Sequence, residues 1–270
     1  MRSIYKGYKI TESPKITEIY TAFSKEFGPD FHFRGETHDF WELVCVTSNQ
    51  ISVAADSQVF VLKKGQAILH NPMQFHNISA IGNTSSIAVF TFSGEEIPQI
   101  QNKILEISDI SEVAALVELA NKYYKLRYGF RIKDLKNDDS SHLIYVKRLE
   151  LFLLQLANNL SREGKISSRS AVNYSVIVET INKNLDKRLS VAELAVLCNM
   201  SEINLQKTFS RYAGVGVVEY YNRLKMRKAT QFLSEGLSVK ETALKLGFQD
   251  QNYFSTVFKR IIGSPPSKFK

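Results

Sequence analysis

The sequence predicts an α+β protein of two domains, with a β-rich N-terminal domain and an all-α C-terminal domain. Three observations predict this fold class. Short runs of β-branched and aromatic residues, separated by turn-forming residues, fill most of the first hundred positions. Apolar residues then repeat every three or four positions, as they do on helices. The net charge of +8 is also uneven, because residues 171–270 hold 15 Lys and Arg against 8 Asp and Glu, whereas residues 1–170 hold 20 against 19.

The composition excludes several classes of protein. A length of 270 residues suffices for two domains, and 44% hydrophobic with 23% charged residues is a globular balance. No run approaches the ~18 apolar residues of a transmembrane helix, and the N-terminus lacks the apolar run of a secretory signal. The two cysteines, Cys45 and Cys198, lie too far apart for a disulfide framework or a cysteine-rich metal site. We therefore expect a cytoplasmic protein that does not enter a membrane.

The β part is expected at about residues 16–95. Several short strands at close spacing predict a sandwich or a small barrel. Four runs have strand character and are bounded by turn-prone residues: 42–47, 51–55, 58–62 and 86–92.

Helices are expected at about residues 98–162, where the apolar period changes. Residues 110–126 and 141–160 carry apolar side chains at helical spacing. The second of these helices has an apolar face wide enough for two partners, the β part and a second subunit, although packing within its own domain explains the face equally well. We assign residues 1–162 to one domain and the polar, aperiodic residues 163–171 to a linker.

Residues 172–270 contain an internal repeat. Leu-Ser-Val-Ala-Glu-Leu-Ala begins at residue 189, and Leu-Ser-Val-Lys-Glu-Thr-Ala begins 48 residues later. Each copy pairs a serine with a glutamate three residues on, which is the capping-box spacing at the start of a helix. A short turn and a second helix follow, and Gly214 and Gly263 are expected to end the two copies. This pattern predicts two helix-turn-helix motifs, joined by a helix over residues 217–233.

The repeat resembles the DNA-binding domain of AraC/XylS-type transcription regulators. Residues 243–269 carry the family's second-motif signature, with its Gly-Phe turn, Tyr-Phe, Phe-Lys and Gly-x-x-Pro ending. Residues 35–44 and 65–76 resemble the two cupin motifs, and a cupin-like β-barrel is the usual sensor domain of the same family. The resemblance implies a cupin-like effector-sensing and dimerisation domain with accessory helices, followed by a tandem helix-turn-helix domain.

In this family the second helix of each motif enters the major groove. Leu205, Phe209, Phe254 and Phe258 are expected to face the core, which leaves polar side chains for the DNA. The expected base contacts are Ile203, Gln206, Lys207, Gln251, Asn252, Ser255 and Thr256. The expected phosphate contacts are Arg211, Lys259, Arg260 and Lys268. Because the two helices differ, they should contact different sequences about one helical turn, ~34 Å, apart.

The β-rich domain holds a candidate effector pocket. Its expected residues are Glu36, His38, Trp41, Glu42, His70 and His76. Phe31, Phe33 and Phe40, together with Trp41, are candidates for stacking on a flat ligand, and a place in the core explains them equally well. Metal-binding cupins use His-x-His, a nearby Glu and a later His. Here Glu36 takes the place of the first His, so a ligand-binding or structural role is favoured over a metal held by His38, Glu42 and His76. We expect no cofactor.

These features favour a sequence-specific transcriptional regulator that binds promoter DNA and is controlled by a small-molecule effector. In the family that the chain resembles, this effector is most often a sugar. The apolar helices of the N-terminal domain favour a homodimer, and an activator would also contact RNA polymerase. No catalytic residues are expected. The alternatives are a metal-dependent cupin enzyme with a DNA-binding tail and a non-specific architectural DNA-binding protein, for which only the salt dependence of binding is characteristic.

Overall fold

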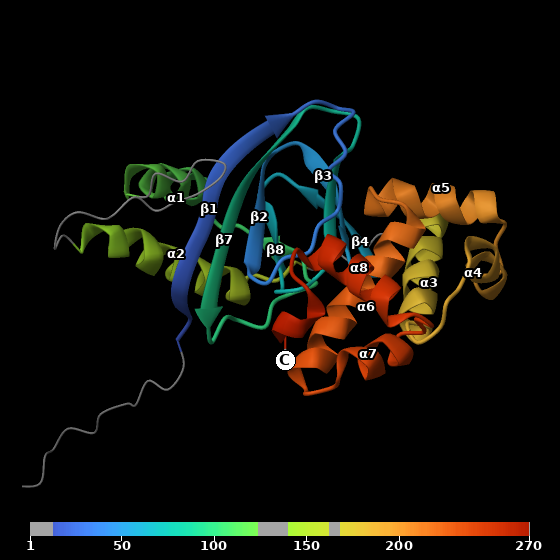
Figure 1. Cartoon of the computed structure of the whole chain (residues 1–270). Helices are drawn as coiled ribbons and strands as arrows, with labels where there is room; N and C mark the ends of the chain where they lie inside the picture. The colour runs from blue at the N-terminus through green and yellow to red at the C-terminus, as the bar shows by residue number, and fades with distance from the viewer. Residues whose placement is uncertain (1–12, 124–139, 162–167, 270) are drawn as a thin grey trace, which may run out of the picture.

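The computed structural model describes residues 13–123, 140–161 and 168–269. In this part of the chain a β-rich N-terminal domain lies beside a helical C-terminal domain, which confirms the predicted fold class (Figure 1). The strands are β1 Lys15–Phe27, β2 Trp41–Ser48, β3 Gln50–Ala55, β4 Gln58–Lys63, β5 Gln66–His70, β6 His76–Ala80, β7 Ser85–Glu95 and β8 Leu105–Glu106.

The strands form two antiparallel sheets. One sheet has the order β1-β7-β2-β5-β8, and the other has the order β4-β3-β6. Because side chains alternate along a strand, Val44 and Val89 belong to the core between the two sheets, whereas Leu43 and Phe90 face the helices outside. Within the described residues the two sheets do not join into one hydrogen-bonded cylinder, so the predicted barrel is a cupin-like pair of facing sheets.

The four predicted strands lie within β2, β3, β4 and β7. The sequence analysis named no strand at β1, β5, β6 or β8. In β1 the register against β7 shifts between Ile16 and Glu18 and again between Ile19 and Thr21, and these irregularities break the two-residue period by which a strand is identified. The other three strands are too short to show a period.

Two helices cover the outer face of the five-stranded sheet (Figure 1). They are α1 Ile110–Tyr123 and α2 Ser141–Asn158. Leu116 of α1 and Leu149 of α2 belong to the same core as Phe90 of the sheet. The last residues of the predicted helix 110–126 lie outside the described part of the chain. None of the helices in that part is long and apolar enough to cross a membrane.

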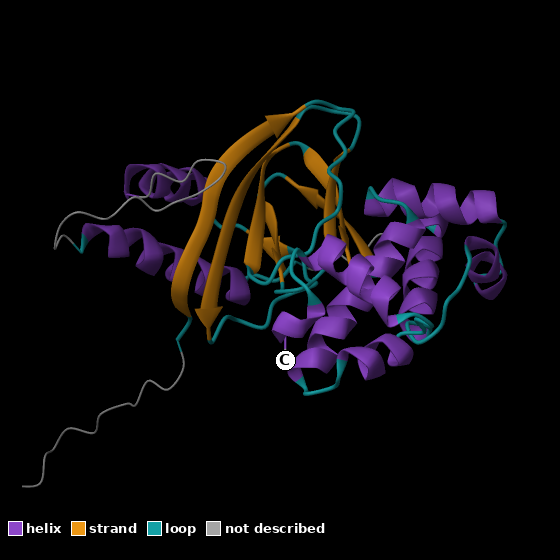
Figure 2. Ribbon diagram, viewed as in Figure 1, coloured by secondary structure: helices purple, strands orange, loops and turns teal. Residues whose placement is uncertain are grey.

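The C-terminal domain consists of helices and short turns (Figure 2). Both predicted capping boxes form, and Gly214 and Gly263 end their helices with φ of +67° and +85°, which favours glycine. The side chain of Ser168 accepts a hydrogen bond from the Ala171 amide, so α3 begins inside the predicted linker 163–171 and shortens it. The helices are α3 Arg169–Lys183, α4 Val191–Leu197, α5 Glu202–Ala213, α6 Val217–Ser234, α7 Val239–Lys245 and α8 Gln251–Ile262, followed by a 3₁₀ turn Pro266–Phe269.

The C-terminal domain docks on the three-stranded sheet (Figure 1). Phe75 of the N-terminal domain meets the Tyr220 ring edge-to-face at 4.7 Å between centroids. Asp56 forms an ion pair of 3.8 Å with Arg227 of α6, and the Ser175 hydroxyl donates to the carbonyl of Ser57. The sheet and the first helix-turn-helix motif therefore share one apolar core.

Candidate functional site

The first candidate DNA-contacting helix is α5. Ser201 caps it, and Leu205 and Phe209 are buried in the domain core. Ile203 is 80% exposed, and Gln206 and Lys207 are exposed beside it. These three side chains have the outward orientation that the sequence indicated, and their contact with bases stays a prediction.

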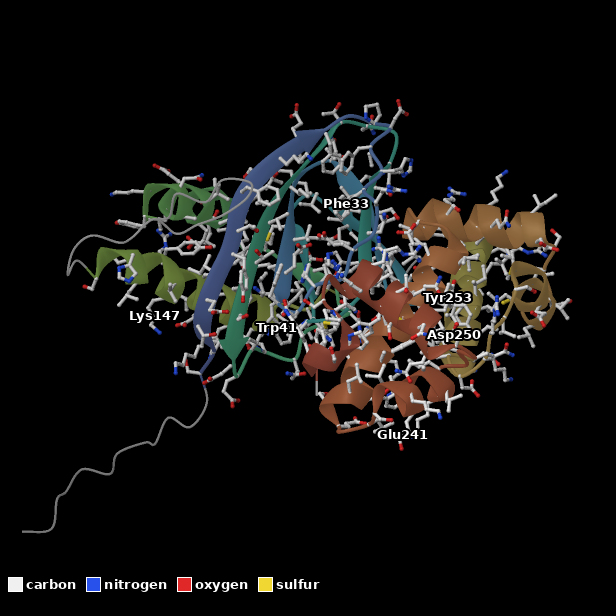
Figure 3. All side chains as sticks on the ribbon, viewed as in Figure 1. Phe33, Trp41, Lys147, Glu241, Asp250 and Tyr253 are labelled. Carbon is white, nitrogen blue, oxygen red and sulfur yellow. The ribbon has the colours of Figure 1, made fainter. Side chains whose placement is uncertain are left out.

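The second candidate helix is α8, which begins where Asp250 accepts hydrogen bonds from the Asn252 and Tyr253 amides. Gln251 and Asn252 are exposed at its first turn. Tyr253, which was not among the predicted base contacts, is 57% exposed on the same turn (Figure 3). It directly precedes the buried Phe254, so the helical period in the sequence already placed its side chain away from the core.

The two hydroxyl residues of α8 are held by their own helix. Ser255 donates to the Gln251 carbonyl at 2.8 Å, and Thr256 donates to the Asn252 carbonyl at 2.9 Å. These bonds use the hydroxyl protons, so both side chains present acceptor oxygens and, for Thr256, a methyl group. Ser255 is half-buried and Thr256 is exposed.

The four expected phosphate contacts are all exposed. Arg211 lies near the end of α5 and Lys259 near the end of α8, while Lys268 lies in the final 3₁₀ turn. Arg260 has a different setting, because it lines a cleft of about 700 Å³ between the two domains, together with Arg223. Its contact with phosphate stays a prediction.

A buried lysine joins the two helix-turn-helix motifs. The motifs have separate apolar cores, and α6 contributes to both. The Nζ of Lys225 on α6 donates hydrogen bonds to two carbonyls. One is that of Lys187, which precedes α4 in the sequence, and the other is that of Leu246 at the end of α7, at 2.7 Å. Burial lowers the pKa of Lys225 to about 8. This side chain therefore fixes the first helix of each motif to the helix between them.

The N-terminal domain contains a cavity of about 390 Å³ between its sheets. Phe31, Phe33 and Phe40 line it, and their stacking on a ligand stays a prediction. Trp41 belongs with the core on the opposite face of the five-stranded sheet, because it precedes Glu42 on β2 and side chains alternate. Every second residue in the last part of β1 also lines the cavity, and none of these residues was among the predicted pocket residues: Thr21, Phe23, Lys25 and Phe27.

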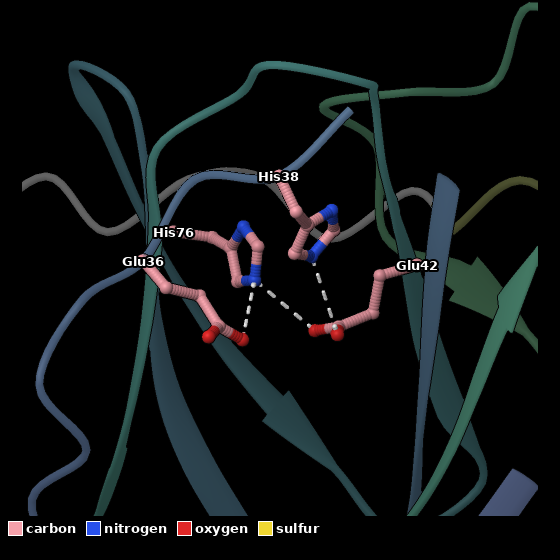
Figure 4. Close-up of side chains that lie close together, drawn as sticks. All are labelled: Glu36, His38, Glu42 and His76. Atoms are coloured by element: carbon pink, nitrogen blue, oxygen red, sulfur yellow. Dashed lines mark ion pairs between the residues drawn. The ribbon is translucent and has the colours of Figure 1, made fainter. Parts of the chain in front are cut away.

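One end of the cavity is polar. Glu36, His38, Glu42 and His76 each aim one side-chain atom at a common point, and these atoms all lie within 4.8 Å of one another (Figure 4). The Nε2 of His76 lies 3.2 Å from a Glu42 oxygen and 3.7 Å from a Glu36 oxygen, and the Nε2 of His38 lies 3.6 Å from the other Glu42 oxygen. The structure thus brings together four of the six expected pocket residues.

Backbone carbonyls orient both histidines of this cluster. The Nδ1 of His38 lies 3.0 Å from the Phe40 carbonyl, and the Nδ1 of His76 lies 3.1 Å from the Gln74 carbonyl. A carbonyl only accepts, so each Nδ1 carries a proton and each Nε2 faces the carboxylates. Both Nε2 atoms are buried and have no hydrogen-bond partner among the described residues.

The fifth pocket residue, His70, stands behind the cluster. Its ring stacks on His76 with 4.4 Å between centroids, and its Nδ1 lies 3.1 Å from the Gln74 side-chain oxygen. Burial, with the charge of His76, lowers the pKa of His70 to about 3, so this ring is neutral at physiological pH. It supports the His76 ring rather than facing the cavity.

The cluster is strongly polarised. Burial disfavours the charge of both Glu42 and His76, but the electrostatic attraction between the two side chains outweighs it. The pKa of Glu42 consequently lies well below its usual range, and that of His76 lies above its own. The buried Glu42 carboxylate, with the half-exposed Glu36 beside it, needs a positive charge close by, which either a proton on His76 or a divalent cation supplies.

The four residues fit a metal ion. Nitrogen and oxygen ligands at ~2.1 Å in a tetrahedral arrangement stand about 3.4 Å apart, close to the measured separations of 3.2, 3.6 and 3.7 Å. Metal-bound histidines generally donate their second ring N–H to a carbonyl or carboxylate, as His38 and His76 do here. Two imidazoles with two carboxylates suit Zn²⁺, Mn²⁺, Fe²⁺ or Ni²⁺.

Comparison with known proteins assigns both domains. A model described as an AraC-like ligand binding domain matches residues 25–119, and one described as a helix-turn-helix domain matches residues 178–270. Over 248 residues the chain is 25% identical to the uncharacterized HTH-type transcriptional regulator YfiF of Bacillus subtilis (strain 168), covering 86% of this chain and 77% of YfiF. The chain belongs to the AraC family of transcriptional regulators.

Other relatives of this regulator match a smaller part or at lower identity. The bifunctional transcriptional activator/DNA repair enzyme AdaA of Bacillus subtilis (strain 168) is 29% identical over 96 residues, which are 35% of this chain and 46% of AdaA, so the alignment spans less than half of that relative. The crystal structure of ToxT from Vibrio cholerae O395 is 16% identical and covers 92% of this chain and 96% of ToxT, with a TM-score of 0.38.

Proposed function

We propose that this regulator binds a two-part operator in double-stranded DNA through α5 and α8 and adjusts that binding to a small molecule in the N-terminal cavity. The observation that carries the proposal is the pair of capped helices with different exposed polar side chains, joined through Lys225 into one unit. Leu205 and Phe209 of α5 lie in one core and Phe254 and Phe258 of α8 in the other, so the opposite, exposed face of each helix is free to enter a major groove. We place the protein in the cytoplasm, where promoter DNA lies.

The cavity supports an effector with an apolar or aromatic body. Five phenylalanines line it, two from β1 and three from the segment after β1, with aliphatic residues of β6 and β7. Among its polar residues, Glu36, His38 and Glu42 converge on one point. This lining favours an apolar body with one polar end over a sugar, which carries hydroxyl groups on all sides.

We further propose that α2 forms the dimer contact. Its inner side belongs to the core of the N-terminal domain, and its outer side carries four exposed apolar residues at helical spacing: Leu143, Ile144, Leu151 and Leu154. A stripe of this kind is typical of a helix that packs against a second copy. Two copies would present four DNA-contacting helices, and an activator of this arrangement would also contact RNA polymerase.

The first experiment is a selection from random DNA duplexes with the purified full-length chain, followed by sequencing of the bound fraction. Enrichment of a motif with two parts about one helical turn, ~34 Å, apart is expected. Equal, salt-sensitive binding of all sequences would instead establish an architectural protein. A metal-dependent enzyme with a DNA-binding tail would require turnover by the metal-loaded protein, and we propose that it has none.

A further inference from the structure

The polar end of the cavity shares a wall with the interface between the domains. This wall is the segment of residues 31–38, here called the coupling segment. It runs beside β6, with Phe33 donating to the Ile78 carbonyl at 2.9 Å, and Glu36 and His76 bonded to each other through both backbone amides at 2.9 and 3.1 Å. The coupling segment therefore moves with β6 and with His76.

The inner side of the coupling segment faces the cavity and the cluster. Phe31 and Phe33 contribute apolar surface to the cavity wall, and Glu36 and His38 contribute two of the four converging side chains. Glu36 is the least anchored of the four, because its side chain is 47% exposed and meets the cluster only through His76. Glu36 also lines the cleft between the domains, so this residue borders both the cavity and the cleft that Arg223 and Arg260 line.

The outer side of the coupling segment is clamped by the DNA-binding domain. The Gly35 amide donates to the Ala213 carbonyl at the end of α5 at 3.3 Å, and the Arg223 guanidinium of α6 donates to the Gly35 carbonyl at 2.8 Å. A Cβ on Gly35 would overlap the Phe75 ring and would lie 2.8 Å from the Ala213 oxygen. Residue 35 is therefore closely packed against both domains, and a displacement of the coupling segment there acts directly on the end of α5.

We propose that Glu36, His38, Glu42 and His76 bind a divalent transition-metal ion, and that the ion controls the docking of the DNA-binding domain through Gly35. Coordination brings the Glu36 carboxylate to ~2.1 Å from the ion and holds the coupling segment against β6. The Gly35 clamp is then fixed, and with it the position of α5. The metal part stands on the cluster alone, whereas its effect on DNA rests on the proposed function.

The binding test uses the full-length chain after treatment with a chelator. Co²⁺ is titrated and its visible absorption bands recorded, and the heats of Zn²⁺ and Mn²⁺ binding are measured. We expect one ion per chain, and at least tenfold weaker binding in Glu36→Gln, a half-exposed position where the fold tolerates the change. His76→Gln should abolish binding. The matched control is Asp39→Asn, whose exposed side chain lies outside the cluster and which should bind the ion normally.

The coupling test compares hydrogen exchange and operator affinity with and without Zn²⁺. Exchange should slow in the coupling segment and around residues 209–224, and operator affinity should change at least threefold. Arg223→Ala should bind the ion with normal affinity but lose the change at the operator. Coupling is reciprocal, so operator DNA should alter the affinity for the ion by the same factor.

The outcomes separate the two levels of the proposal. Absence of cobalt bands and of heat at millimolar ion would show that a proton on His76 balances the cluster, and would overturn the metal site. Metal binding without any change in exchange or operator affinity would overturn the coupling. Metal binding with slowed exchange, in a chain that selects no DNA sequence, would support the metal-controlled docking and overturn the proposed DNA function instead.

Discussion

At the scale of single residues, the proposed base specificity depends on exposed side chains of α5 and α8. Gln206 is exposed on α5 and is free to pair with adenine through its amide. Gln206→Ala should lower affinity for the selected operator by about 1–3 kcal/mol and relax base preference at one position. Quantitative binding to a set of single-base operator variants measures this. Gln99→Ala, an exposed glutamine of the N-terminal domain, is the control, and an equal loss there would contradict the assignment.

Lys225, unlike the exposed Gln206, is buried, and both of its hydrogen bonds go to carbonyls within the protein. Lys225→Met should lower the free energy of unfolding by about 2–3 kcal/mol, because two buried carbonyls lose their donor. The pKa of Lys225 falls from its usual 10.5 to about 8, so between these values the unfolded chain binds more protons than the folded one. The stability of the wild type relative to Lys225→Met should therefore rise from pH 8 to pH 10.5, as urea unfolding would measure.

At the scale of elements, we expect different residues of α8 to determine the affinity for DNA and the preference for particular bases. Lys259 lies in its last turn, away from the expected base contacts. Lys259→Ala should weaken binding to all sequences alike and reduce the slope of log K against log salt by about 1. Lys64→Ala removes the same charge from an exposed turn of the N-terminal domain and should leave the slope unchanged. A change confined to one base position would assign Lys259 to the bases instead.

The exposed stripe of α2 gives a second prediction at this scale. Leu151 is 55% exposed, so Leu151→Glu should leave the fold intact and convert a dimer into a monomer. Sedimentation equilibrium at micromolar protein measures the change. Val172→Glu, which alters an equally exposed apolar residue of α3, should remain dimeric. A wild-type protein that sediments as a monomer would refute the proposed contact.

The elements also show how far the sequence predicts this molecule. The capping boxes at Ser190 and Ser238 are local, because the serine and the glutamate that bond to each other lie three residues apart, and both formed as predicted. The cavity is non-local. The contribution of residues 21–27 of β1 to it depends on pairing with residues 85–91 of β7, which no local pattern specifies. The cluster is an intermediate case. The cupin motifs in the sequence indicate Glu36, His38, Glu42 and His76, whereas the convergence of their side chains is non-local.

At the scale of the whole molecule, the interface between the two domains combines close contacts with buried polar groups whose hydrogen bonding is not satisfied. The hydroxyls of Tyr174 and Tyr220 are buried in the interface and have no hydrogen-bond partner among the described residues. An unsatisfied buried hydroxyl costs roughly 1–3 kcal/mol, which separation of the domains would recover through water. The docked arrangement is therefore held by the Gly35 clamp and by apolar contact against an internal cost, which fits the proposed response of this interface to a ligand.

Asp56 contributes to the same cost and can be tested by pH. Burial raises its pKa although Arg227 opposes this, so the folded chain holds the Asp56 proton more tightly than the unfolded chain does. A carboxyl of this kind stabilises the fold at pH values below its ordinary pKa of 3.8, and the contribution is lost as pH rises through the raised pKa. Asp56→Asn keeps the oxygen that accepts from the Phe75 amide and removes the charge. The variant should therefore gain stability relative to the wild type between pH 4 and pH 7, measured by urea unfolding at each pH. Asp39→Asn, at an exposed position, should show no such gain, and a loss of stability in Asp56→Asn at pH 7 would show that the ion pair with Arg227 outweighs the cost of burial.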